Sequence, residues 1–195
     1  MRFWEFVFTA LVSEVTPGPN MGYLVALSLA QGRRAGLAAV AGVALGLALL
    51  GCATAFGMGL LSEAVPGLAL ALRWCGVLYL LWLAFDSWRD DQADGRADMA
   101  VSFRRGLVTN LLNPKAAIFY VAVIPLFLPT PASQQQVLFL TAVFVAIATA
   151  VHAVLVLCAS KVRALLFHPD RERAIRRCAA LSMAAVALWF AWSTR

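Results

Sequence analysis

Charge is scarce in this sequence. Only 13% of its 195 residues are Asp, Glu, Lys or Arg, whereas 62% are hydrophobic. A typical soluble domain has about 25% charged residues, which supply its polar surface. The shortage excludes an ordinary soluble protein and predicts an all-α polytopic membrane protein, in which lipid replaces the polar coat.

Cysteine and histidine are also scarce. The chain has two histidines, and its four cysteines form no Cys-x-x-Cys motif and no metal-ligand spacing with a histidine. A metal or cation exporter would need clustered ligands, and a thiol-redox electron carrier of the inner membrane would need cysteines beside its broken helices. We keep both as alternatives to a transporter of organic substrates, and we expect no metal, no cofactor and no enzymatic activity. The cysteines, interpreted as packing residues, are Cys52, Cys75, Cys158 and Cys178.

Six apolar stretches approach the length of about 20 helical residues that a membrane span needs. The last stretch is short, which leaves a five-span count open. Their bounds are about Phe3–Leu27, Ala35–Leu61, Gly67–Phe85, Phe103–Leu128, Val137–Ser160 and Ala179–Ser193.

Positive charge follows the first, third and fifth stretches, whereas the loops expected at 62–66 and 129–136 contain no Lys or Arg. Basic loops stay in the cytoplasm, so we expect both termini on the outer side of a bacterial inner (plasma) membrane. This pattern also explains the net charge of +6 without nucleic-acid binding, since no basic and aromatic face is present. The basic residues are Arg33, Arg34, Arg89, Arg96, Arg104, Arg105, Lys161, Arg163, Arg171, Arg173, Arg176 and Arg177.

The longest polar segment divides the single transmembrane domain into two halves. Repeat one covers about residues 1–88, a cytoplasmic loop about 89–102, and repeat two about 103–195. In each half a proline interrupts the first span. Because each half has three spans, the second must be inserted upside down. Matching interrupted spans in such an inverted repeat indicate a binding site.

The first interruption is Ser13-Glu14-Val15-Thr16-Pro17-Gly18-Pro19-Asn20. Pro17 and Pro19 remove backbone donors, and Gly18 permits backbone angles that other residues resist. We expect two half-helices, the second beginning near Pro19, with freed carbonyls and amides that face a protein cavity. Thr16 can fill a freed backbone bond. A simple proline kink is the alternative.

The second interruption is Asn110-Leu111-Leu112-Asn113-Pro114-Lys115, where Pro114 is placed to begin a half-helix. Two opposed helix N-termini would favour a substrate carboxylate. The amides of Asn20, Asn110 and Asn113 are expected either to bind substrate or to cap half-helices. His152, the one residue that interrupts its apolar stretch, is interpreted as a hydrogen-bonded packing residue.

Glu14 and Lys115 place opposite charges in the middle of apolar stretches. A charge there costs several kcal/mol unless it is paired or protonated. Glu14 is therefore a candidate proton carrier or ligand for a substrate ammonium group, and Lys115 a candidate ligand for a substrate carboxylate. A structural ion pair between the two is the alternative.

Gly42-x-x-x-Gly46 is a motif that lets helix backbones approach closely in lipid. We expect it to pack helices within one chain. The seam of a homodimer is the alternative.

Four segments of the sequence match a known pattern. They are Thr16-Pro17-Gly18-Pro19-Asn20, Gln31-Gly32-Arg33-Arg34-Ala35-Gly36-Leu37, Arg73-Trp74-Cys75-Gly76 with Tyr79-Leu80, and Gly106 with Asn110–Ala116. They resemble the lysine exporter and homoserine/threonine resistance family of amino-acid efflux proteins. The resemblance implies a secondary active exporter of amino acids or close derivatives, driven by protons, with small amino-acid-like substrates, protons and membrane lipid as partners. Glu14 departs from the pattern, since many members have an apolar or small residue there.

Overall fold

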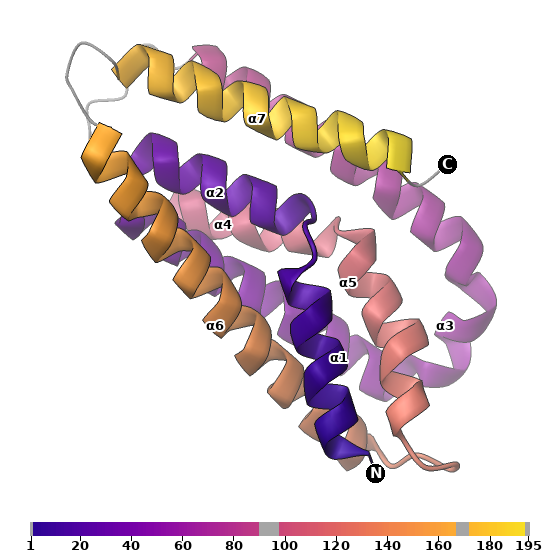
Figure 1. The fold of residues 1–195 in the computed structure, drawn as a ribbon. Helices are drawn as coiled ribbons and strands as arrows, with labels where there is room; N and C mark the ends of the chain where they lie inside the picture. The colour runs from indigo at the N-terminus through magenta and orange to yellow at the C-terminus, as the bar shows by residue number, and fades with distance from the viewer. Residues whose placement is uncertain (1, 90–97, 167–171, 194–195) are drawn as a thin grey trace.

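The protein is helical throughout the part that the structure describes. The computed structural model describes residues 2–89, 98–166 and 172–193, and none of these residues lies in a strand. The predicted all-α class is therefore confirmed (Figure 1). The helices are α1 (Phe3–Val15), α2 (Pro19–Gln31), α3 (Arg33–Arg89), α4 (Met99–Leu111), α5 (Pro114–Ile118), the π-helix η1 (Phe119–Val123), the 3-10 helix η2 (Ile124–Phe127), α6 (Gln134–Leu166) and α7 (Glu172–Ser193).

Both proline-interrupted stretches form two helical pieces. The first stretch is divided into α1 and α2, which begins at Pro19. The second is divided into α4 and a further piece that begins at Pro114 and continues through η1 and η2. The two pieces of the second stretch are inclined by 53°. The half-helices start at the prolines because a proline needs no intrahelical donor in the first turn of a helix.

The predicted loop at 62–66 is wrong, since the backbone stays helical from Arg33 to Arg89. The helix nevertheless folds back (Figure 1). Gly42 lies against Phe103 and Gly76 against Leu112, both on the same short stretch of chain, whereas a straight helix would separate the two glycines by about 50 Å. A proline within a helix bends it more readily than it ends it, and Pro66 lies in this region.

Two uninterrupted helical segments, Arg33–Gly57 and Gln134–Leu165, are long and apolar enough to cross a membrane, and the bent stretch around Pro114 would make a third. In the last helix, the apolar part covers Arg177–Trp189. The six-span inverted repeat therefore stays a prediction. Most of the predicted cytoplasmic loop, residues 90–97, and Arg171 lie outside the described residues.

Large apolar side chains cover much of the outside. Trp4, Phe8, Phe56 and Leu165 have exposed fractions between 68% and 86%. Such a surface is unsuited to water and suited to lipid. The observation agrees with the membrane location that the composition predicts.

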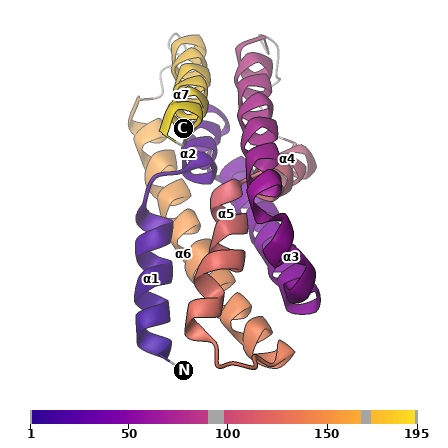
Figure 2. The ribbon, with the colours of Figure 1, turned by 90° about the vertical axis from the view of Figure 1, so that its right-hand side faces the viewer.

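The basic ends of several helices gather at one end of the bundle, away from the N-terminus (Figure 2). Arg105 in the middle of α4 forms an ion pair with Asp86 near the end of α3, at 2.5 Å. Arg177 of α7 lies over the ring of Trp88, also near the end of α3. The clustering is what loops on one side of a membrane would require.

The interior has two apolar clusters. One surrounds α2 and includes Tyr23 and Leu24 with residues of α3, α6 and α7. The other surrounds α1 and η1 and includes Phe6 and Tyr120. The break between α1 and α2 lies where the chain passes from one cluster to the other, so polar groups there face a gap in the apolar packing.

The glycine motif packs within the chain. A Cβ atom on Gly42 would lie 2.0 Å from the carbonyl oxygen of Phe103, and one on Gly46 would lie 2.7 Å from the side chain of Asn110. The expected packing of helices within one chain is confirmed.

Candidate functional site

The first break follows from the two prolines. The last helical amide bond of α1 runs from the Thr16 N–H to the Val12 carbonyl. The next donor in the helix would be residue 17, but Pro17 has no N–H, so the carbonyl of Ser13 loses its helical partner. The Thr16 hydroxyl also donates to the Val12 carbonyl, at 2.7 Å.

The second break is capped by a side chain. The Asn113 Oδ1 accepts a hydrogen bond from the Lys115 amide at 3.1 Å, which fits the preference of asparagine for helix N-caps. Asn113 therefore acts as a cap, one of the two roles expected for it. The first turn of α2 has no side-chain cap, because its N-cap residue is Gly18.

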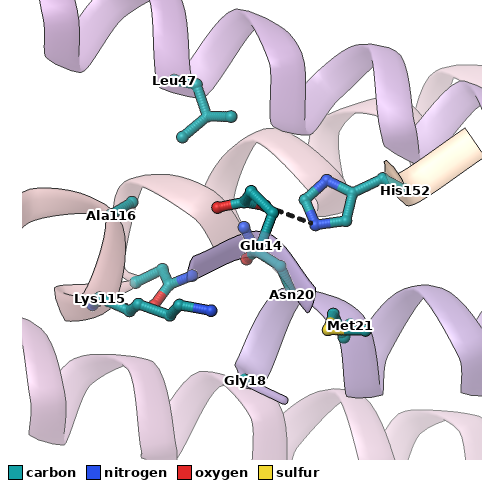
Figure 3. Close-up of a pocket in the computed structure, with 9 residues that line it drawn as sticks. Glu14, Gly18, Asn20, Met21, Leu47, Lys115, Ala116 and His152 are labelled. Atoms are coloured by element: carbon teal, nitrogen blue, oxygen red, sulfur yellow. Dashed lines mark hydrogen bonds and ion pairs between the residues drawn. The ribbon is translucent and has the colours of Figure 1, made fainter. Parts of the chain in front are cut away.

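The structure brings the two breaks together (Figure 3). The Lys115 ammonium donates hydrogen bonds to the carbonyl oxygens of Ser13 and Thr16, the second at 2.8 Å. The Asn20 Nδ2 donates to the Asn110 Oδ1 at 2.8 Å, and both side chains are buried. The stem of Lys115 passes beside Gly18, where an added Cβ would lie 3.4 Å from its Cδ.

The carboxylate of Glu14 contacts the imidazole of His152, which was predicted to be a hydrogen-bonded packing residue. Its Oε2 lies 3.3 Å from the Nε2 of His152, which is 2% exposed, and the Nδ1 of His152 has no partner among the described residues (Figure 3). His152 thus lies in the site. Its burial and its contact with Glu14 agree with the expected buried, partnered residue. As an ionisable residue inside an apolar span it also carries the signal that marks functional positions.

The alternative of a Glu14–Lys115 ion pair is wrong as a direct contact. Lys115 donates to backbone carbonyls. Within the described part of the chain, the basic side chain beside the Glu14 carboxylate is that of His152, which carries a charge only when protonated. The physical reason is the break itself, since carbonyls without helical donors compete successfully for the ammonium.

A small cavity lies between these groups. It measures about 10 Å³, room for about one water molecule. Polar and apolar groups share its wall. The lining residues are Glu14, Gly18, Asn20, Met21, Leu47, Asn113, Lys115, Ala116 and His152.

The other predicted site residues lie around this cavity without lining it. Asn110 accepts a hydrogen bond from Asn20, and Pro19 and Pro114 are buried at the starts of their half-helices. Thr16 and Pro17 are exposed, and Pro17 acts by ending α1. No cysteine lines the cavity, and no three His, Cys, Asp or Glu side chains of the described ranges lie close enough to hold a metal ion.

Comparison with known proteins gives the family. The family model described as LysE type translocator matches residues 11–194. The leucine efflux protein of Klebsiella pneumoniae is 32% identical over 146 residues, covering 71% of this chain and 69% of its own, and that of an Enterobacter strain is 31% identical, covering 72% and 70%. A membrane protein of Vibrio cholerae is 33% identical, covering 69% of each chain. No solved structure matches.

The match extends from the end of α1, before the first break, to the last helix. The predicted resemblance to the lysine exporter group is confirmed, as is the prediction of a transporter in place of an enzyme. The chain belongs to the LysE type translocator family and is a membrane transport protein.

Proposed function

We propose that this protein is a secondary active exporter of amino acids, with its substrate site at the cavity between the two breaks. One observation carries the proposal: an acid, an ammonium group and asparagine amides from both broken stretches meet in one buried cavity. Two of its relatives are leucine efflux proteins, so leucine is the first substrate to test.

A zwitterionic amino acid matches the groups around the cavity. Lys115 uses two of its three N–H donors on carbonyls, and the third, with the first amides of α2, would bind the substrate carboxylate. Glu14 would bind the substrate ammonium group. Leu47 and Met21 would contact an apolar side chain such as that of leucine.

Transport requires the cavity to open, since about 10 Å³ is too small for any amino acid. We propose that the two repeats, about 1–88 and 103–195, are each three spans of an inverted repeat in the inner membrane. Rocking of one against the other would expose the cavity first to the cytoplasm and then to the outside. Both termini would lie outside.

Glu14 is the group proposed to carry the coupling proton. A carboxylate buried in a span changes its protonation state when its partners change, and His152 lies at 3.3 Å as the neighbour with which it can share a proton. Substrate release followed by protonation of Glu14 would return the empty carrier to the cytoplasmic side.

Efflux of labelled leucine from loaded vesicles, with and without a pH gradient, tests the proposal. We expect the gradient to accelerate efflux by the wild type, and Glu14→Gln to lose this acceleration because it cannot release a proton. Glu5→Gln is the matched control, since Glu5 lies on the same helix and is exposed. Full gradient dependence in Glu14→Gln would remove the proton role, and a wild type that exports no amino acid of a broad panel would contradict export itself.

A further inference from the structure

The C-terminal end of α1 concentrates uncompensated negative charge. The Ser13 carbonyl lacks its helical donor because residue 17 is proline, and the Val15 carbonyl lacks one because residue 19 is proline. The end of a helix also carries the negative pole of its dipole. Within a membrane span no water serves such groups, so this charge must be satisfied by a donor or a cation from another segment.

Lys115, from the other broken stretch, supplies the positive charge that satisfies this break. Its ammonium donates to the carbonyls of Ser13 and Thr16, which lie about a hundred residues earlier in the chain. Its stem runs past Gly18, where an added Cβ would be in van der Waals contact with the Lys115 Cδ at 3.4 Å. An ammonium group and a monovalent metal ion make similar demands on such a site, because both need several oxygen atoms around a single positive charge.

We propose that the α1 break is a monovalent-cation site that the ammonium of Lys115 occupies permanently. In transporters with broken helices, carbonyls at the end of a half-helix hold a free coupling cation. Here a covalently attached cation takes that position, so the break stays neutralised at every stage without an ion from solution. Lys115 is thus a positioning residue that holds the two breaks together as well as a ligand.

One consequence concerns coupling and rests on the proposed function. A site already filled by an attached cation leaves no place for sodium, so export needs none. The cation site itself does not depend on the transported substrate, and it can be tested without transport.

Thermal unfolding of the purified protein in three salts of equal ionic strength tests the site. The salts are sodium chloride, methylammonium chloride and choline chloride, whose cation is too large for the break. Lys115→Ala removes the ammonium and leaves space, whereas Lys115→Met removes the charge and fills the space. Lys161→Ala, which removes an exposed lysine of α6, is the control.

We expect both Lys115 variants to melt below the wild type in choline. Sodium or methylammonium should then raise the melting temperature of Lys115→Ala by about 2–4 °C or more over choline. Lys115→Met, Lys161→Ala and the wild type should show no such difference. Equal responses of the Ala and Met variants, or stabilisation of the wild type by sodium, would overturn the proposal.

A second variant covers the case in which Lys115→Ala does not fold. Pro17→Ala returns an N–H to residue 17, where it can serve the Ser13 carbonyl. The loss of melting temperature caused by Lys115→Met should therefore be smaller in the Pro17→Ala background than in the wild type. An unchanged loss shows that Lys115 does not replace the donor missing from the break, and overturns the proposal.

Discussion

Asn20 and Asn110 connect the two broken stretches by a single buried hydrogen bond. Each amide also has an atom without a partner among the described groups, Oδ1 of Asn20 and Nδ2 of Asn110. The pair lies next to the cavity, and Gly46 leaves the space that the Asn110 side chain occupies. Removal of one amide would leave the other buried with no partner at all.

Asn110→Ala should lower the stability by about 1–3 kcal/mol, because it leaves the Asn20 donor unsatisfied. Asn20→Ala should cost a similar amount. The double variant should cost less than the sum of the two, since the residues interact directly. A double-mutant cycle of thermal stability in detergent measures this coupling. Strict additivity would show that the hydrogen bond contributes nothing.

The sequence identified the polar and charged residues of the site but not the groups that they contact. Charges and amides in apolar stretches are conspicuous because lipid makes them costly, so Glu14 and Lys115 could be identified directly. Which group satisfies each of them depends on helix packing. Lys115 therefore seemed a partner for Glu14, while the actual neighbour, His152, lies on a helix far away in the sequence.

Among the described glycines, those at the crossing of α3 and α4 lie closest to the backbone of a neighbouring helix. A Cβ on Gly106 would lie 2.2 Å from the carbonyl oxygen of Ala39, and one on Gly42 would lie 2.0 Å from that of Phe103. Each glycine therefore faces the backbone of the other helix. Since α4 leads directly into the second break, the crossing determines where Asn110 and Lys115 lie.

Gly42→Ala and Gly106→Ala should each destabilise the protein by about 1–3 kcal/mol, because backbone must move to admit a methyl group. The melting temperature should fall by about 2–4 °C for each kcal/mol. Ala41→Val is the control, since Ala41 is exposed on the same helix. Equal melting temperatures for the glycine variants and the control would refute the close crossing.

Helix breaks were predictable and helix bends were not. Pro17, Pro19 and Pro114 sit beside polar residues, and the chain is interrupted at each cluster. Pro66 lies between Val65 and Gly67, and the backbone of α3 remains helical through it, although α3 as a whole folds back (Figure 1). A proline indicates that the helix is perturbed. Whether the helix bends or breaks there depends on how the segments on either side of the proline pack, which for α3 means their packing on α4.

The number of spans sets the sides of the two termini. With six spans both termini lie outside, as the basic loops predict, whereas a five-span chain would leave its C-terminus in the cytoplasm. A reporter that is active only outside the cytoplasm, fused after Arg195, should therefore be active. A matched fusion within residues 90–97, in the predicted cytoplasmic loop, should be inactive. An inactive C-terminal fusion would favour five spans.

Composition alone indicated the kind of molecule, because a chain with so little charge cannot cover itself in water. Family membership agrees with this. The inverted repeat is defined by the orientation of each half in the membrane, and this orientation does not follow from the helices alone.

Substrate protection at the cavity tests most directly whether both breaks form one transport site. In a cysteine-free protein, Met21→Cys and Ala116→Cys would place a thiol on each side of the cavity. Gln135→Cys, exposed at the start of α6 and outside the apolar stretches, would serve as the control. We expect leucine to slow the reaction of both cavity thiols with a water-soluble maleimide several-fold, while the control is unaffected. Unprotected labelling at both positions in a protein that still exports leucine would mean that the substrate passes elsewhere.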